Sequence, residues 1–217
     1  MFLFQFLYTY LIHTYNQTEI RIIQLGISTF HALFTSILST GFVLNLYNEA
    51  YFLKLISVSF GFALFDINYH WKHKVGIWKQ MIFHHIIILV SSLPLLYEDF
   101  LGVPIIQNYS YMLARNYMSE ISTITLNCIW FYHYTNRIFH TGYILFCLLT
   151  LINFFLFRIV NGSFLVYNVL MNYRYTTLQY AQYAIYFMNC IWFYKLYQKW
   201  NNTFIQYKNY RKIKKQN

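Results

Sequence analysis

The sequence predicts an all-α protein, a multi-pass bundle of six or seven membrane-spanning helices. Three observations lead to this prediction. Of the 217 residues, 58% are hydrophobic and only 10% are charged, which is far from the usage of a soluble domain. The apolar residues gather in runs close to the roughly 20 residues that a helix needs to cross a bilayer. Seven of the sixteen Lys and Arg residues lie between Lys195 and Lys215, outside those runs.

The chain divides into three parts. Residues 1–20 are a short apolar segment, expected either to span the membrane or to lie at its surface, and a span here would be the seventh. Residues 21–199 are the transmembrane domain, and residues 200–217 are a basic tail. The six runs predicted to span the membrane are Ile22–Leu46, Phe52–Trp71, Met81–Leu96, Tyr109–Phe131, Tyr143–Val160 and Thr176–Tyr197.

Basic residues near the span ends predict the orientation, because cytoplasmic loops are rich in Lys and Arg. With the chain before Ile22 in the cytoplasm, twelve of the sixteen cations fall on that side, the C-terminal tail included. The four on the opposite side are Lys54, Arg115, Arg158 and Arg174. A cytoplasmic basic tail favours an anchor at the membrane over a surface for nucleic acid.

The last four residues, Lys214-Lys215-Gln216-Asn217, have the form of a dilysine retrieval signal. Such a signal would place the protein in the endoplasmic reticulum, and it works only on a cytoplasmic tail. A generic basic tail explains the same residues equally well.

Polar residues inside the spans recur at the spacing of one helix face, which is three, four, seven or eleven residues. Since polar stripes in lipid turn toward one another or toward water, we expect them to face the inside of the bundle. The stripes are Ser28, His31, Thr35 and Ser39; Ser59, Asp66, His70 and His73; His84 with Ser91 and His85 with Ser92; Asn116, Glu120, Thr123 and Asn127; and Gln182 with Asn189.

The rise of 1.5 Å per residue predicts the depth of these groups. Asp66, His84 and Asn127 each lie about five residues inside the cytoplasmic end of a span, roughly 8 Å below the surface. Glu120 and His31 lie deeper, near the midplane. We therefore expect a polar cavity that opens toward the cytoplasm and is lined by His31, Asp66, His84, His85, Glu120 and Asn127.

This pattern resembles the TLC-domain family, which includes the ceramide synthases and the translocating-chain-associating membrane proteins. The resemblance covers Arg21 to about Tyr197 and implies a lipid-handling protein of the endoplasmic reticulum. It rests on Ser28-Thr29-Phe30-His31, Gly61 to Asp66, His84-His85, Glu120-Ile121-Ser122 and Asn127 to Trp130.

Ceramide synthases are known for a pair of acidic residues in a later helix. Here Glu120 is the only later acid inside a span, whereas Glu98 and Asp99 are expected in the loop after Leu96. The chain therefore resembles the smaller TLC-domain proteins more than the ceramide synthases proper.

Two main functions are consistent with these residues. In the first, the protein binds, senses or regulates membrane lipids in the cavity without chemistry. In the second, it is an N-acyltransferase that uses acyl-CoA as a substrate. His84 or His85 would then be the general base, Asp66 would orient the base, and Asn127 would donate to the oxyanion. A cargo receptor of the endoplasmic reticulum is a third alternative, which only the tail supports.

Partners for the buried acids are also predicted. Asp66 is expected to pair with His70, His84 or His85, and Glu120 with His31. Helix-packing hydrogen bonds for the acids, and headgroup contacts for the histidines, remain alternatives. No cofactor or metal is predicted, because the residues match no close metal-ligand spacing. The expected partners are membrane lipids and not nucleic acid, and the sequence does not predict an oligomeric state.

Overall fold

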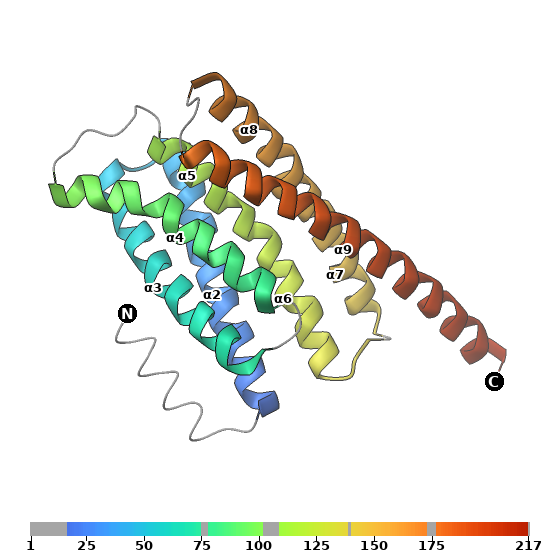
Figure 1. Cartoon of the computed structure of the whole chain (residues 1–217). Coiled ribbons are helices and arrows are strands. Elements are labelled where there is room, and N and C mark those ends of the chain that lie inside the picture. Colours follow the sequence, from blue (N-terminus) through green and yellow to red (C-terminus); the bar gives the residue numbers. More distant parts are fainter. Residues whose placement is uncertain (1–16, 75–77, 102–108, 139, 173–176, 217) are drawn as a thin grey trace.

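The computed structural model describes residues 17–74, 78–101, 109–138, 140–172 and 177–216, and its regular elements in these ranges are helices. They form six helical rods (Figure 1). In order these are α2 (Gln17–Val43); α3 (Glu49–His73); α4 (Trp78–Leu101); α5 (Tyr109–Tyr117) with the 3-10 turn η1 (Met118–Glu120) and α6 (Ile121–Tyr134); α7 (Thr141–Phe154) with the π-helical η2 (Phe155–Val160) and α8 (Asn161–Asn172); and α9 (Thr177–Gln216). Most of the N-terminal apolar segment lies outside the described residues, so a seventh span stays untested.

Three helical stretches among the described residues are long and apolar enough to cross a membrane. They cover Glu19–Val43, Glu49–His73 and Thr141–Met171. Large apolar side chains also lie on the outside of the bundle, where Phe30, Ile37 and Phe187 are 71%, 62% and 68% exposed. Because exposed apolar surface is unfavourable in water and favourable in lipid, we describe the chain as a membrane protein.

The interior combines apolar packing with polar side chains. Phe52 and Ile56 of α3 are fully buried and pack against Leu113 and Ala114 of α5. Most of the predicted stripes also face inward. Their buried members are His31, Thr35, Ser39, Ser59, Asp66, His84, His85, Ser91, Ser92, Asn127, Gln182 and Asn189. Apolar surface outside and polar groups inside is the arrangement expected for helices that pack together in lipid.

The turn after α3 determines which residues of α4 lie level with Asp66. Lys74 ends α3 in a left-handed backbone conformation (φ 48°), and its N–H donates to the carbonyl oxygen of His70 (2.9 Å). The chain then returns as α4, which runs alongside α3 in Figure 1. As a result, the second turn of α4, with His84 and His85, lies level with the last turns of α3, with Asp66.

The fifth rod is longer than the sequence predicts. We expected this span to end at Val160, with Arg158 close to the far side of the membrane. Instead the helix continues through η2 and α8 to Asn172, and Arg158 lies inside the bundle with only 5% of its surface exposed. The chain tolerates this position because oxygen atoms of neighbouring helices accept hydrogen bonds from the guanidinium.

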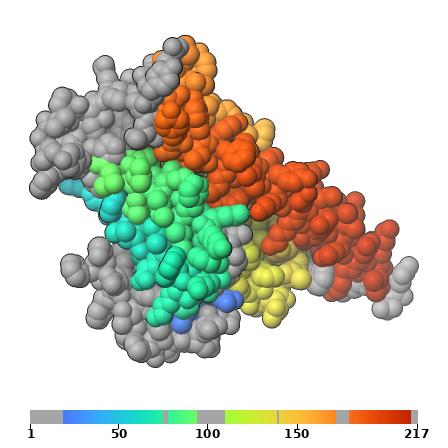
Figure 2. Space-filling model, in the orientation of Figure 1, coloured from blue at the N-terminus to red at the C-terminus, as the bar shows by residue number. Residues whose placement is uncertain are grey.

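Two other helices continue past their expected ends. The backbone of α4 is helical to Leu101, so Glu98 and Asp99 belong to a helix and not to a loop. α9 runs for 40 residues to Gln216, so the basic tail expected from residue 200 is helical too. At 1.5 Å per residue α9 is about 60 Å long. Figure 2 shows its C-terminal part extending beyond the rest of the molecule.

Gly142, in the first turn of α7, tests the packing between α6 and α7, and Gly26 of α2 is its control. A Cβ atom at Gly142 would collide with the hydroxyl of Tyr132, whose ring stacks on His140 with centroids 5.7 Å apart. We expect Gly142→Ala to lower the free energy of unfolding by about 1–3 kcal/mol. At Gly26 a Cβ atom meets nothing within 4 Å, so Gly26→Ala is expected to be neutral or stabilising by up to about 1 kcal/mol. Unfolding in detergent, followed by circular dichroism, measures both, and equal effects would contradict this packing.

Candidate functional site

A buried carboxylate joins three helices near the turn between α3 and α4. Asp66 is only 2% exposed. Its Oδ1 accepts a hydrogen bond from Gln24 Nε2 of α2 (2.8 Å), and its Oδ2 lies 2.7 Å from His85 Nε2 of α4. His70 Nε2, one turn later on α3, is 3.3 Å from the same oxygen. We call these four residues, Gln24, Asp66, His70 and His85, the Asp66 cluster.

The carboxylate determines which nitrogen of His85 carries a proton. An ionised carboxylate only accepts hydrogen bonds, so Nε2 of His85 must be the donor. Nδ1 of His85 is buried and has no hydrogen-bond partner among the described residues. In the neutral ring, Nδ1 holds a lone pair that can accept a proton, and a carboxylate opposite a ring N–H is the arrangement that orients a basic histidine. Nδ1 of His70 is likewise buried without a described partner.

His84 does not face Asp66, although its ring centroid lies 5.4 Å from that of His85. Adjacent residues on a helix point about 100° apart, so only one of the two histidines can face Asp66. The His84 ring contacts Trp192 of α9, with centroids 5.5 Å apart, and the indole N–H of Trp192 donates to Gln80 Oε1 (3.1 Å). His84 therefore lies between α4 and α9 and makes no hydrogen bond to Asp66 that the structure describes.

His31 lies deeper in the bundle and is separated from the cluster by an aromatic ring. Its imidazole stacks on Phe62 with centroids 3.9 Å apart, and its Nε2 lies 3.2 Å from Ser59 Oγ. The edge of Phe62 in turn meets His85 at 6.0 Å. The two histidines are thus neighbours of one phenylalanine.

Glu120 is half-buried in η1, and it interacts electrostatically with both His31 and Arg158. Within the described part of the chain it forms no direct hydrogen bond with either residue. Its expected pairing with His31 is therefore a longer-range attraction and not a close contact.

Asn127 joins helices and does not face the histidines. Its Nδ2 donates to Ser28 Oγ (3.1 Å) and to Thr29 Oγ1 (3.0 Å), which fastens α6 to α2. An amide NH₂ group has two hydrogens, and both are engaged here. This geometry does not support the expected role of Asn127 as a donor to an oxyanion beside His85.

Arg158 is a buried cation that the sequence did not predict to be inside. Its Nε, Nη2 and Nη1 donate to Ser122 Oγ (2.7 Å), Thr123 Oγ1 (2.8 Å) and Asn189 Oδ1 (3.3 Å). A signal for this site was available, because Thr123 and Asn189 belong to predicted stripes to which no Lys or Arg was assigned. Gln24 was missed for a different reason. It lies four residues before Ser28 and continues that stripe, but an uncharged residue near the end of a span does not by itself indicate a buried partner.

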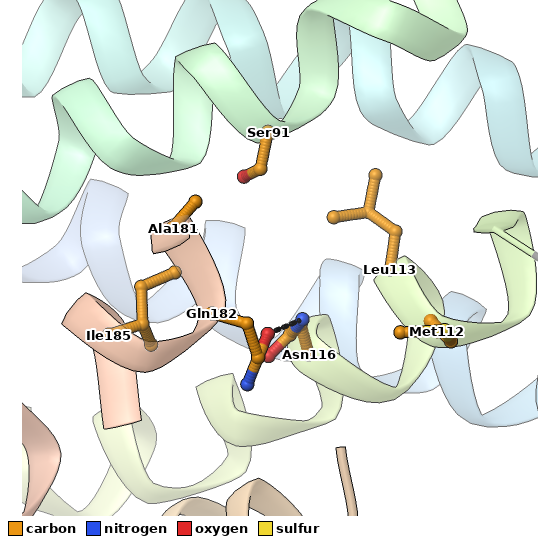
Figure 3. Close-up of a pocket in the computed structure, with 7 residues that line it drawn as sticks. All are labelled: Ser91, Met112, Leu113, Asn116, Ala181, Gln182 and Ile185. Atoms are coloured by element: carbon orange, nitrogen blue, oxygen red, sulfur yellow. Dashed lines mark hydrogen bonds between the residues drawn. The ribbon is translucent and has the colours of Figure 1, made fainter. Parts of the chain in front are cut away.

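The two spaces described next do not reach the predicted cavity residues. A cavity of about 10 Å³, which is room for about one water molecule, lies between α4, α5 and α9. Figure 3 shows Ser91 across this space from Asn116, whose Nδ2 donates to Gln182 Oε1 (2.8 Å). An apolar groove of about 350 Å³ lies on the outside, beside Phe34 and Lys54. Neither space is lined by any of the six residues expected in the polar cavity.

Among the residues that the structure describes, no group of three His, Cys, Asp or Glu side chains has the arrangement of a metal site. Comparison with protein-family models, with characterised proteins and with solved structures finds no match.

The Asp66 carboxylate can be tested through stability. Asp66→Asn keeps the shape but places an amide against donors from three helices, and we expect the free energy of unfolding to fall by about 3–5 kcal/mol. Ser57→Ala is the control, because Ser57 is an exposed residue of the same helix and its loss should change stability by less than about 0.5 kcal/mol. Thermal unfolding of the purified protein measures both. A melting temperature of Asp66→Asn equal to that of the wild type would contradict the role of the carboxylate.

Proposed function

We propose that this chain is a multi-pass protein of the endoplasmic reticulum membrane, of the TLC-domain kind, that binds a membrane lipid at the Asp66 cluster to sense or regulate it. The observation that carries the proposal is the buried carboxylate with two imidazoles in a bundle whose outer surface is apolar. Ionisable groups at such a depth are costly, so they are usually retained for function.

The orientation in this proposal rests on the cations. With Arg158 buried inside the bundle, three and not four Lys or Arg residues remain for the side opposite the cytoplasm, against twelve on the cytoplasmic side. The ends of α3 and α6 and the starts of α4 and α7 would then face the cytoplasm. The Asp66 cluster would lie just below that surface, within reach of a lipid headgroup.

The ligand would enter between α4 and α9. Asp66 and His85 are buried, and the cavity between these two helices holds no more than about one water molecule. Trp192 covers His84 at the cytoplasmic end of the same contact, and a single hydrogen bond to Gln80 holds its indole. Movement of α9 away from α4 would therefore uncover His84, whose ring centroid lies 5.4 Å from that of His85, and Trp192 is the side chain that has to move.

The alternative function, acyl transfer, is supported by the buried Nδ1 of His85. This nitrogen would take the proton of a sphingoid amine as the nitrogen attacks the thioester carbon of acyl-CoA. The C–N bond forms, the C–S bond breaks, and the proton passes from His85 to the leaving thiolate. Asp66 would stabilise the imidazolium between the two steps. His84 has no such carboxylate, so His85 is the base in this scheme.

Lipid binding is tested by mass spectrometry of lipids that co-purify with the protein. We expect a lipid in wild-type protein at near-stoichiometric amount and at least a tenfold loss in His85→Gln, because the variant removes the imidazole while its amide can still donate to Asp66 and keep the helices together. His133→Gln is the control, since His133 is an exposed histidine at the end of α6. Equal amounts of co-purifying lipid in all three proteins would contradict the proposal.

Acyl transfer is tested by incubating the purified protein with a long-chain acyl-CoA and a sphingoid base. If His85 is the base, wild type forms the amide, His84→Ala keeps most of the activity, and His85→Ala loses on the order of 100-fold or more. The absence of amide product with wild type would leave the protein without the enzymatic function.

A further inference from the structure

The C-terminal part of α9 carries most of its positive charge on one face. Lys208, Arg211 and Lys212 are spaced at i, i+3 and i+4, so they share a face of the helix, and all three are exposed. Lys215 continues the series in the sequence at i+7. All six Asp and Glu residues of the protein precede Ile121, so no acid in α9 balances this charge. We call Lys208, Arg211 and Lys212 the basic stripe.

Aromatic rings one turn earlier support two of these cations. The ammonium of Lys208 lies 4.5 Å from the ring centroid of Phe204, and the guanidinium of Arg211 lies 5.9 Å from that of Tyr207. Such contacts are worth about 0.5–1 kcal/mol at exposed sites and restrict the motion of the side chains. Two of the three cations of the stripe thus have an aromatic partner on the same continuous helix.

Contacts with the bundle determine the height of the stripe. The hydroxyl of Tyr207 lies 3.2 Å from Thr141 Oγ1, at the first residue of α7, and Trp200 packs against Tyr143 and Cys147. If the start of α7 is at the cytoplasmic surface, the stripe begins directly beyond that surface and extends roughly 8 Å farther along the helix. The headgroup layer of one leaflet is about 5–8 Å thick, so the stripe and this layer coincide.

We propose that the basic stripe binds the anionic phospholipid headgroups of the cytoplasmic leaflet. This inference rests on the orientation given under the proposed function, but it does not depend on the Asp66 cluster. The partner is a lipid and not a nucleic acid or an acidic protein, because the stripe lies at headgroup depth and follows a turn of Trp200, Phe204 and Tyr207. Aromatic residues of this kind mark the interface between membrane and water. Clusters of cations directly beyond a spanning helix attract anionic lipid.

The experiment titrates the purified full chain in nonionic detergent with short-chain phosphatidylserine or phosphatidylcholine and counts bound lipid by native mass spectrometry. Wild type is expected to prefer phosphatidylserine. Lys208→Gln, Arg211→Gln and Lys212→Gln together should weaken that binding on the order of 100-fold, because each cation near a membrane surface contributes about 1 kcal/mol. A single-charge pair is the matched control: Lys208→Gln should weaken binding about fivefold, whereas Lys54→Gln, which removes an exposed cation expected on the opposite side of the membrane, should bind like wild type.

Several results would overturn the proposal. They are equal binding of the two lipids by wild type, equal weakening in Lys208→Gln and Lys54→Gln, and tighter binding of an acidic peptide or an oligonucleotide than of phosphatidylserine. Protease access to a C-terminal tag in sealed vesicles tests the orientation separately. The stripe variant leaves the Asp66 cluster intact, so it should still co-purify with the lipid of the proposed function. A failure of one proposal is therefore distinguishable from a failure of the other.

Discussion

The buried carboxylate of Asp66 is the constraint on which the arrangement of the first helices depends. A charge in an apolar bundle is tolerated only when donors surround it, and here the donors come from α2, from α4 and from α3 itself. A shift of α4 by one residue would turn His85 away by about 100° and leave the carboxylate without its closest partner. The same contact that could support chemistry therefore also fixes the register of three helices.

The sequence predicted this centre well, because polar residues in apolar helices are rare and their spacing shows which face they share. On these grounds Asp66 was expected to pair with His70, His84 or His85, and the structure brings His70 and His85 to it. The direction of His84 and the partners of Asn127 were not, because they depend on the rotation of whole helices against one another. Arg158 was misplaced since Arg158, Asn161 and Gly162 together look like the end of a span, whereas accepting oxygens on other helices let the helix continue.

The last helix shows a second limit of sequence patterns. Hydropathy falls after Tyr197, which indicates where lipid contact ends and says little about where the helix ends. No Gly or Pro follows Gly162 in the sequence, so nothing in α9 interrupts a helix that begins at Thr177. Contacts of Trp200 and Tyr207 with α7 then hold the first part of the expected tail against the bundle, and the basic stripe follows on the same helix. A segment expected as a tail is thereby a fixed part of the fold.

Phe62 divides the polar interior. One face of its ring covers the imidazole of His31, and its edge meets His85. A hydrocarbon ring can neither give nor take a proton, so no relay of hydrogen bonds can pass directly from one imidazole to the other through it. Phe62 therefore separates His31 and Ser59 from His85 and Asp66. Proton transfer between His31 and His85 by this route would require a change of the Phe62 rotamer.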